Sequence, residues 1–121
     1  MPATRKLSIL LVLAFGIGIA PVFAEEPVRH VHYGSFAGYW IPLHLVEPID
    51  REIAFSRQTY YIGFYDKAGK LYRVEKYFDG ALFFRHDYAY YENGVIRESR
   101  IWNADGVEAV NRFDERGTLR D

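Results

Sequence analysis

A tight-turn motif recurs along the second half of this 121-residue chain. Each of three copies places an aromatic residue before an acidic one, then a glycine and an aliphatic residue, over residues 64–71, 90–96 and 112–119. Two further glycine turns, at residues 79–80 and 105–106, fall between the copies. Glycine readily adopts the positive φ that a tight hairpin turn requires, and Asp or Asn tolerates it next best. The motif therefore predicts a series of β-hairpins.

Between these turns the sequence alternates with a period of two, which is typical of strands with one buried face. We expect strands over residues 59–65, 71–78 and 82–90, followed by two less regular ones. The residues expected on the buried face are Tyr60, Ile62, Phe64, Tyr72, Val74, Phe78, Leu82, Phe84, His86, Tyr88 and Tyr90. The sequence thus predicts an all-β fold, an antiparallel meander of about 5–7 strands in a curled sheet or half-barrel.

A single-layer meander needs a cover for its apolar face. Residues 36–45 are the apolar material that remains for this role, and they include Trp40 and Leu43. We expect residues 25–58 to form an irregular lid segment that contributes a first strand or two. A short helix is also expected over residues 48–55, because proline is tolerated in a first helical turn and acidic residues follow it.

The N-terminus has the pattern of a signal peptide over residues 1–24. Arg5 and Lys6 precede an apolar stretch, and Ala24 completes the small-residue pattern of a cleavage site. We expect cleavage after Ala24, one mature domain over residues 25–121, and a location in the periplasm or the medium. The alternative is an uncleaved anchor, but the apolar stretch is short for a bilayer span.

Composition narrows the class of protein further. The chain contains no cysteine, which excludes a lipidated cysteine, a disulfide framework and a thiol nucleophile. Loss of Arg5 and Lys6 leaves 13 basic against 16 acidic residues, a formal net charge of −3. No basic block remains in the mature chain, so we expect no nucleic-acid partner and no membrane contact after cleavage.

The turn residues carry a resemblance to known repeat families. Residues 65–71 (Y-D-x-x-G-x-L) resemble the YD repeat of bacterial Rhs-type wall proteins, and residues 90–98 (Y-Y-E-N-G-x-I-x-E) resemble the variant MORN repeat of small bacterial antitoxin-like proteins. Both families build β-hairpins in series. The mature chain also resembles a small bacterial exported family of unknown function, through residues 38–43 (G-Y-x-I-P-L). These resemblances imply the fold and assign no catalytic residue.

His30 and His32 are the candidate metal ligands. They are one residue apart, so on an extended segment both side chains point the same way. Such a pair can supply two ligands to Zn²⁺ or Cu²⁺, with a third from His44 or His86. The alternative is an exposed, weakly ordered N-terminal stretch. Two ligands are a weak signal, and we expect no resident metal or cofactor.

His86 is flanked on its expected face by Phe84 and Tyr88, which places it at or near the core. A buried imidazole must satisfy its ring nitrogens, so we expect a structural histidine bonded to a tyrosine hydroxyl or a backbone carbonyl. The alternative is a general base. Asp87 could not orient it, because adjacent strand residues point to opposite faces. No serine or carboxylate pair has a hydrolase or glycosidase context, and no enzyme is expected.

Aromatic residues also occupy the expected outer face, where arginines flank them. The predicted binding residues are Tyr61, Tyr65, Tyr77, Phe83 and Tyr91, with Arg73 and Arg85. Such a strip is typical of a protein- or glycan-binding face. The alternative is that a curled sheet buries part of both faces.

Export, the aromatic strip and the lack of a catalytic constellation together indicate a protein-binding module of the bacterial envelope, whose partner is an envelope or secreted protein. Two alternatives stay open. One is an inhibitor or immunity-like protein, by analogy with the repeat families. The other is a small metal-binding or enzymatic envelope protein that uses His86 or the His30/His32 pair.

Overall fold

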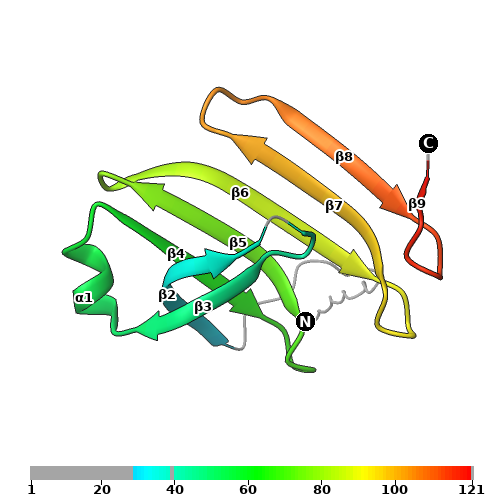
Figure 1. Cartoon of the computed structure of the whole chain (residues 1–121), viewed down its shortest axis with the longest axis horizontal. Helices are drawn as coiled ribbons and strands as arrows, with labels where there is room; N and C mark the ends of the chain where they lie inside the picture. Colours follow the sequence, from blue (N-terminus) through cyan, green and yellow to red (C-terminus); the bar gives the residue numbers. More distant parts are fainter. Residues whose placement is uncertain (1–28, 39, 121) are drawn as a thin grey trace, which may run out of the picture.

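The computed structural model describes residues 29–38 and 40–120. They form one antiparallel sheet of eight strands in the order β3-β2-β4-β5-β6-β7-β8-β9, which does not close on itself (Figure 1). The elements are β2 (Arg29–Ala37), β3 (His44–Ile49), α1 (Arg51–Phe55), β4 (Thr59–Tyr65), β5 (Leu71–Phe78), β6 (Ala81–Tyr90), β7 (Ile96–Asn103), β8 (Glu108–Phe113) and β9 (Leu119–Arg120). The predicted all-β meander is confirmed. Within the described residues, no helix has the length and apolar character needed to cross a membrane.

The recurring motif forms the same five-residue loop at residues 66–70, 91–95, 103–107 and 114–118. In each loop the N–H of the first residue donates to the carbonyl of the fifth, and the glycine N–H donates to the carbonyl of the first. In three of them the Oδ1 atom of Asp66, Asn103 or Asp114 also accepts two backbone N–H groups. These bonds from Thr118 and Arg116 lower the pKa of Asp114. Backbone geometry therefore explains the glycine positions of the motif and its acidic residues Asp66 and Asp114.

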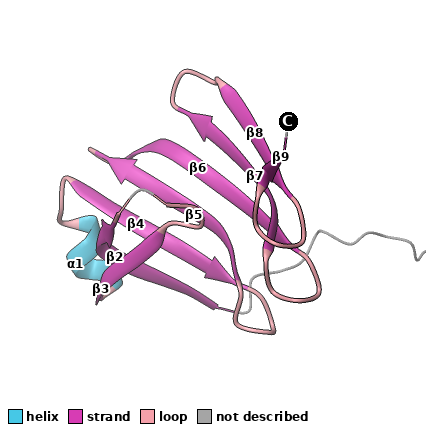
Figure 2. Cartoon of the chain, turned by 45° about the vertical axis from the view of Figure 1, so that its right-hand side comes forward, coloured by secondary structure: helices cyan, strands magenta, loops and turns pink. Residues whose placement is uncertain are grey.

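The N-terminal segment contains regular elements over most of its described part. Within the lid segment predicted over residues 25–58, β2 and β3 are the expected first strands and α1 is the expected short helix. β2 pairs with β4 through residues 29–33 and with β3 through residues 32–37. Its second half therefore leaves β4, and the β2–β3 hairpin folds over one face of the sheet (Figure 2). The helix begins at Arg51, later than predicted, because Pro48 belongs to β3.

We call the covered side, which bears Val74 and His86, the inner face of the sheet, and the opposite side, which bears Arg73 and Asp87, the outer face. The buried core lies between the inner face and the connection from β2 to β3. Its members are Leu43, Val74, Tyr88 and Ile96. Residues 36–45 thus supply the cover that the sequence predicts for them, with Leu43 only 6% exposed.

The predicted buried face of β4 is wrong. Gly63 pairs with Val74, so Tyr61 and Gly63 lie on the inner face, whereas Tyr60 lies on the outer face. Both tyrosines are buried, at 7% exposed for Tyr60 and 4% for Tyr61. The physical reason is that β4 is covered on both sides, by the β2–β3 hairpin and by Phe55 of α1, whose ring lies 5.6 Å from that of Tyr60. When both faces of a strand are covered, the alternation of aromatic residues along it does not show which face points to the main core.

Candidate functional site

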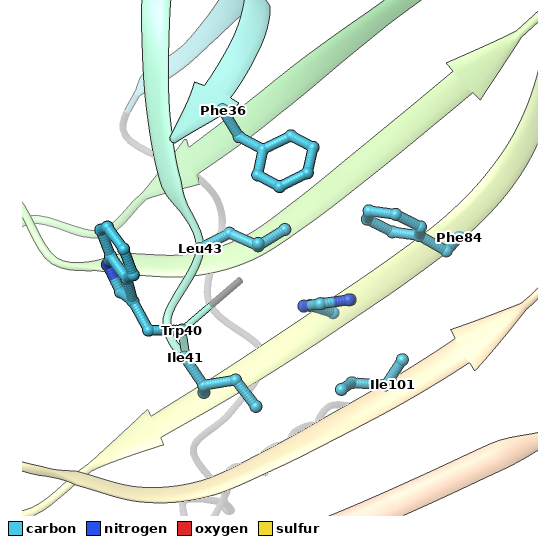
Figure 3. Close-up of a pocket in the computed structure, with 7 residues that line it drawn as sticks. Phe36, Trp40, Ile41, Leu43, Phe84 and Ile101 are labelled. Carbon is cyan, nitrogen blue, oxygen red and sulfur yellow. The ribbon is translucent and has the colours of Figure 1, made fainter. Parts of the chain in front are cut away.

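A cavity of about 180 Å³ lies on the inner face, between the sheet and the connection from β2 to β3 (Figure 3). The connection contributes one wall, and the sheet contributes the other through β6 and β7. The lining residues are Phe36, Trp40, Ile41, Leu43, Phe84, His86 and Ile101. Six of these seven side chains are apolar, and His86 is the polar exception.

The sheet wall is set by strand register. His86 of β6 lies opposite both Val74 of β5 and Ile101 of β7, so all three share the inner face. Phe84, two residues before His86 on the same strand, packs its ring 4.7 Å from the imidazole. The imidazole is therefore held between an aromatic ring and aliphatic neighbours, and its side chain is only 8% exposed.

Two hydrogen bonds connect this histidine to the opposite wall. The backbone N–H of Leu43 donates to the Tyr88 hydroxyl oxygen at 3.0 Å, and that hydroxyl lies 2.8 Å from Nδ1 of His86. Because the tyrosine oxygen already accepts the Leu43 N–H, its own proton is free to be donated to Nδ1. Nδ1 is then the acceptor, and the proton of the neutral imidazole is on Nε2.

Burial keeps both groups of this relay uncharged. It lowers the pKa of His86 to about 4, although Asp87 acts in the opposite direction. Burial likewise raises the pKa of the Tyr88 hydroxyl. The expected burial of His86 and its hydrogen bond to a tyrosine hydroxyl are confirmed. At neutral pH the imidazole is a fixed donor, with its basic nitrogen already occupied.

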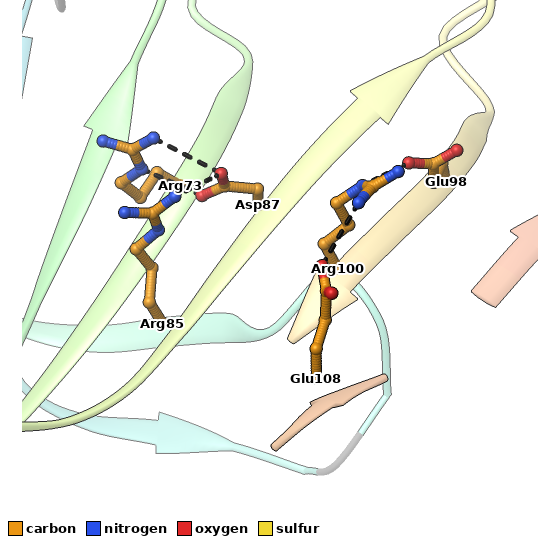
Figure 4. A network of polar contacts seen from close by, with 6 residues as sticks. All are labelled: Arg73, Arg85, Asp87, Glu98, Arg100 and Glu108. Carbon is orange, nitrogen blue, oxygen red and sulfur yellow. Dashed lines mark hydrogen bonds and ion pairs between the residues drawn. The ribbon is translucent and has the colours of Figure 1, made fainter. Parts of the chain in front are cut away.

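Asp87 lies on the outer face, as the alternation of the strand predicts, and belongs to a different network (Figure 4). Its carboxylate accepts from Arg73 Nε at 2.8 Å and from Arg85 Nη2 at 3.1 Å. The Arg85 guanidinium also stacks 4.4 Å above the Trp102 ring. The two predicted binding arginines are therefore held by neighbours on the sheet.

A second set of charges continues along the outer face of β7 and β8. Arg100 donates from Nε to Glu98 at 2.8 Å and from Nη1 to Glu108 at 3.1 Å (Figure 4). Arg112 adds a longer ion pair to Glu98 at 3.4 Å. The outer face of β6, β7 and β8 thus carries paired charges, whereas the inner face holds the cavity.

Comparison with protein families gives one match, to a family of unknown function, DUF6156, over residues 25–121. The chain belongs to DUF6156. No curated protein and no solved structure shows significant similarity to it. Membership in DUF6156 assigns no residue a role, and the likeness to YD and variant MORN repeats stays a prediction.

The structure brings His30 and His32 to the same face, with ring centroids 5.9 Å apart. They belong to strand β2, so the expectation of a weakly ordered stretch is wrong. His32 is buried between Phe55 and Tyr60. This burial is the largest cause that lowers the pKa of His32, and the positive charges of His30 and Arg51 lower it further. Within the described part of the chain, no three His, Asp or Glu side chains are grouped so that they could hold a metal ion.

The predicted aromatic strip is divided between both faces. Tyr61 is buried on the inner face, which contradicts its expected exposure. Tyr65 shares that face and bonds its hydroxyl to that of Tyr33 at 2.6 Å. Tyr77 lies on the outer face, stacked 5.2 Å from Tyr60. The predicted residues do not form one surface, because the β4 residues expected on the outer face lie on the inner face.

The remaining two predicted aromatic residues lie at opposite ends of β6. Tyr91 occupies a turn, where its hydroxyl donates to the carbonyl of Phe113 at 2.6 Å. Phe83 is 46% exposed, beside the turn that joins β5 and β6. Phe83 falls outside the β5–β6 register, since Lys76 pairs with Phe84 and Tyr77 with Leu82. Of the predicted set, Phe83 is the residue with a large exposed apolar side chain.

Sequence reasoning missed the exposed neighbours of Phe83. Phe78 and Leu82 were expected in the core, but they are 41% and 45% exposed. Both flank the two-residue turn of Asp79 and Gly80, where φ is 51° and 80°. Their position directly beside this turn, at the end of the sheet, was the signal that could have indicated exposure.

Proposed function

We propose that this chain is an exported protein-binding module of the bacterial envelope, and that it docks its partner through one apolar end of the sheet. We call this surface the apolar end. It comprises Ile53, Phe55, Phe78, Leu82 and Phe83, which are 49%, 58%, 41%, 45% and 46% exposed. The presence of these five exposed side chains at one end of the sheet is the observation that carries the proposal.

The five residues come from α1, from the last residue of β5 and from the start of β6, which lie at the same end of the sheet (Figure 1). α1 and the β5–β6 turn are joined by a hydrogen bond from the Asp79 N–H to the Gln58 carbonyl, 2.8 Å long. Cations border the surface, with Lys76 Nζ 4.9 Å from the Phe83 ring and the Arg51 guanidinium 6.0 Å from the Phe55 ring. Clustered exposed aromatic groups with a polar border are typical of a protein interface.

Export is supported by the signal-peptide pattern of residues 1–24, which lie outside the described residues, and by the family match that begins at residue 25. Fractionation of cells followed by N-terminal sequencing tests it. The expected product begins at Glu25 in the periplasm or the medium. A protein that keeps Met1 and stays with the cytoplasm contradicts this part of the proposal.

Cross-linking in intact cells, with identification of the captured protein, tests the docking surface. The variant Phe55→Ser/Phe78→Ser/Phe83→Ser should lose the partner and weaken binding of the purified pair by about 10-fold or more. The matched control is Val107→Ser/Leu119→Ser, because these apolar side chains are at least as exposed, at 61% and 60%, and lie outside the apolar end. Equal binding by the two variants, with circular dichroism unchanged, would overturn the proposal. If the partner is an enzyme, loss of its activity on mixing identifies the inhibitor-like form.

A further inference from the structure

The inner-face cavity has a function of its own, apart from the apolar end. We propose that it binds a small uncharged molecule, a single aromatic ring that bears one hydrogen-bond-accepting oxygen, with Nε2–H of His86 donating to that oxygen. Three properties of the cavity lead to this ligand: its volume, its one directed donor, and the absence of charge among its lining residues.

The volume fits one ring with a small substituent. The cavity measures about 180 Å³. An apolar protein cavity of about 150 Å³ accommodates benzene. The lining here is equally suited to a ring, since Phe36, Phe84 and Ile101 present apolar surfaces to it (Figure 3). Trp40 is 58% exposed at this site, so the cavity can be reached from solvent.

The donor is fixed by the relay from the opposite wall. Nδ1 of His86 accepts from Tyr88, whose oxygen is in turn held by the Leu43 N–H. Nε2 therefore carries the proton, and it has no hydrogen-bond partner among the described residues. Among the described residues, the fully buried side-chain atom that lacks a hydrogen-bond partner is Arg85 Nε. Since Nε2 of His86 also lacks a partner among them, it must retain contact with solvent. An N–H at the wall of an apolar cavity gains most from an acceptor on the ligand.

The lining residues discriminate against charged ligands. None of the seven carries a charged side chain at neutral pH, so a carboxylate or ammonium group would lose its hydration without a counter-ion. Arg73 and Arg85 pair with Asp87 on the outer face, and the inner-face cation Lys76 lies outside the lining, with its Nζ over the rings of Phe83 and Phe84. The site therefore favours neutral carbonyl or ether oxygens over acids and amines.

Titration of the ¹⁵N-labelled purified protein with acetophenone, followed by NMR, tests this proposal. Its isostere α-methylstyrene replaces the carbonyl oxygen by a methylene group, and benzoate replaces the methyl ketone by a charge. Acetophenone should bind about 3- to 10-fold more tightly than α-methylstyrene, the gain of one hydrogen bond. Benzoate should bind more weakly than either. The His86 Nε2–H resonance should shift with acetophenone and stay nearly unchanged with α-methylstyrene.

Two variants keep the test decisive. His86→Leu removes the donor, so acetophenone should fall to the affinity of α-methylstyrene. His86→Gln retains an N–H in the same region and should preserve part of the preference, which controls for damage to the fold. Equal affinity of the wild-type protein for all three compounds overturns the proposal. So does an absence of binding at millimolar concentration, or a set of shifted resonances that lies away from the lining residues.

Discussion

The two ends of the strand order differ in what covers them. Under the β2–β3 hairpin, Val74, Tyr88 and Leu43 are between 0% and 6% exposed. At the other end, β8 and β9 contain no buried residue, and Leu119 is 60% exposed. The repeated hairpins build the sheet and carry most of the core residues, whereas the N-terminal segment supplies the cover that buries them.

The uncovered end has ion pairs in place of a core. Glu98, Arg100, Glu108 and Arg112 form a connected set across β7 and β8. Exposed ion pairs contribute little free energy each, roughly 0–1 kcal/mol. We therefore expect the covered half to determine the free energy of unfolding. Matched substitutions at the two ends test this contrast.

The largest effect is expected from removing a leucine side chain. Leu43→Ala should lower the free energy of unfolding by about 3–4 kcal/mol, because it opens a hole between the cover and the sheet. Leu119→Ala makes the same chemical change on an exposed side chain and should cost less than about 0.5 kcal/mol. Urea unfolding measures both. Similar costs at the two positions would refute the contrast.

The pH dependence should come from the covered half. The folded-state pKa of His86 is lowered from 6.5 to about 4. The unfolded state therefore takes up a proton first as pH falls, and stability that is present above pH 6.5 is lost between 6.5 and about 4. The loss should reach roughly 2–3 kcal/mol. Thermal unfolding of His86→Gln should show a shallower slope in this window, with His32 accounting for a further part. An unchanged slope would exclude His86 as a source.

Removing single hydroxyl groups should give a smaller difference between the two ends. Tyr88→Phe leaves the Leu43 N–H without its acceptor and His86 Nδ1 without its donor, at a cost of about 1–3 kcal/mol. Tyr91→Phe removes one half-buried bond to the Phe113 carbonyl and should cost about 0.5–1 kcal/mol. Chemical unfolding of the pair measures the difference. A greater cost for Tyr91→Phe would reverse the expected order.

The smallest effect should come from the charges of the uncovered end. Glu98→Gln removes the ion pairs to Arg100 and Arg112, and should cost at most about 1 kcal/mol. Added salt should abolish the difference from the wild-type protein, because exposed ion pairs are screened. A loss of unfolding free energy that equals that of Leu43→Ala, or that persists in high salt, would show that these charges contribute substantially to stability.

Local sequence signals predicted the elements that depend on local geometry. The bounds of β4 and β5, Thr59–Tyr65 and Leu71–Phe78, are those predicted, because glycine turns fix where each strand ends. The face of β4 was predicted wrongly. Gly63 occupies an inner-face position where a side chain would meet Leu45 Cδ1 at 2.8 Å, so the residue that packs most closely has no apolar signal of its own.

The cavity could not be found in the same way. The sequence indicated that His86 is buried and bonded to a tyrosine, and it gave Leu43 as part of the cover. The hydrogen bond that connects these two residues through Tyr88 runs from Leu43 to Tyr88, which are 45 positions apart. No period or motif encodes that contact, because it depends on the path of the β2–β3 hairpin across the sheet.

The four five-residue loops also bear on the order in which this protein folds. Each loop joins strands that are neighbours in sequence, so its hairpin closes with little loss of chain entropy. The contact between Leu43 and Tyr88 closes a far longer stretch of chain and gains most once the strands beneath it are paired. The sheet should therefore assemble before the cavity exists. Under mild denaturant the cavity should open before the paired strands separate, so a bound ligand would slow amide exchange first at Trp40, Ile41 and Leu43.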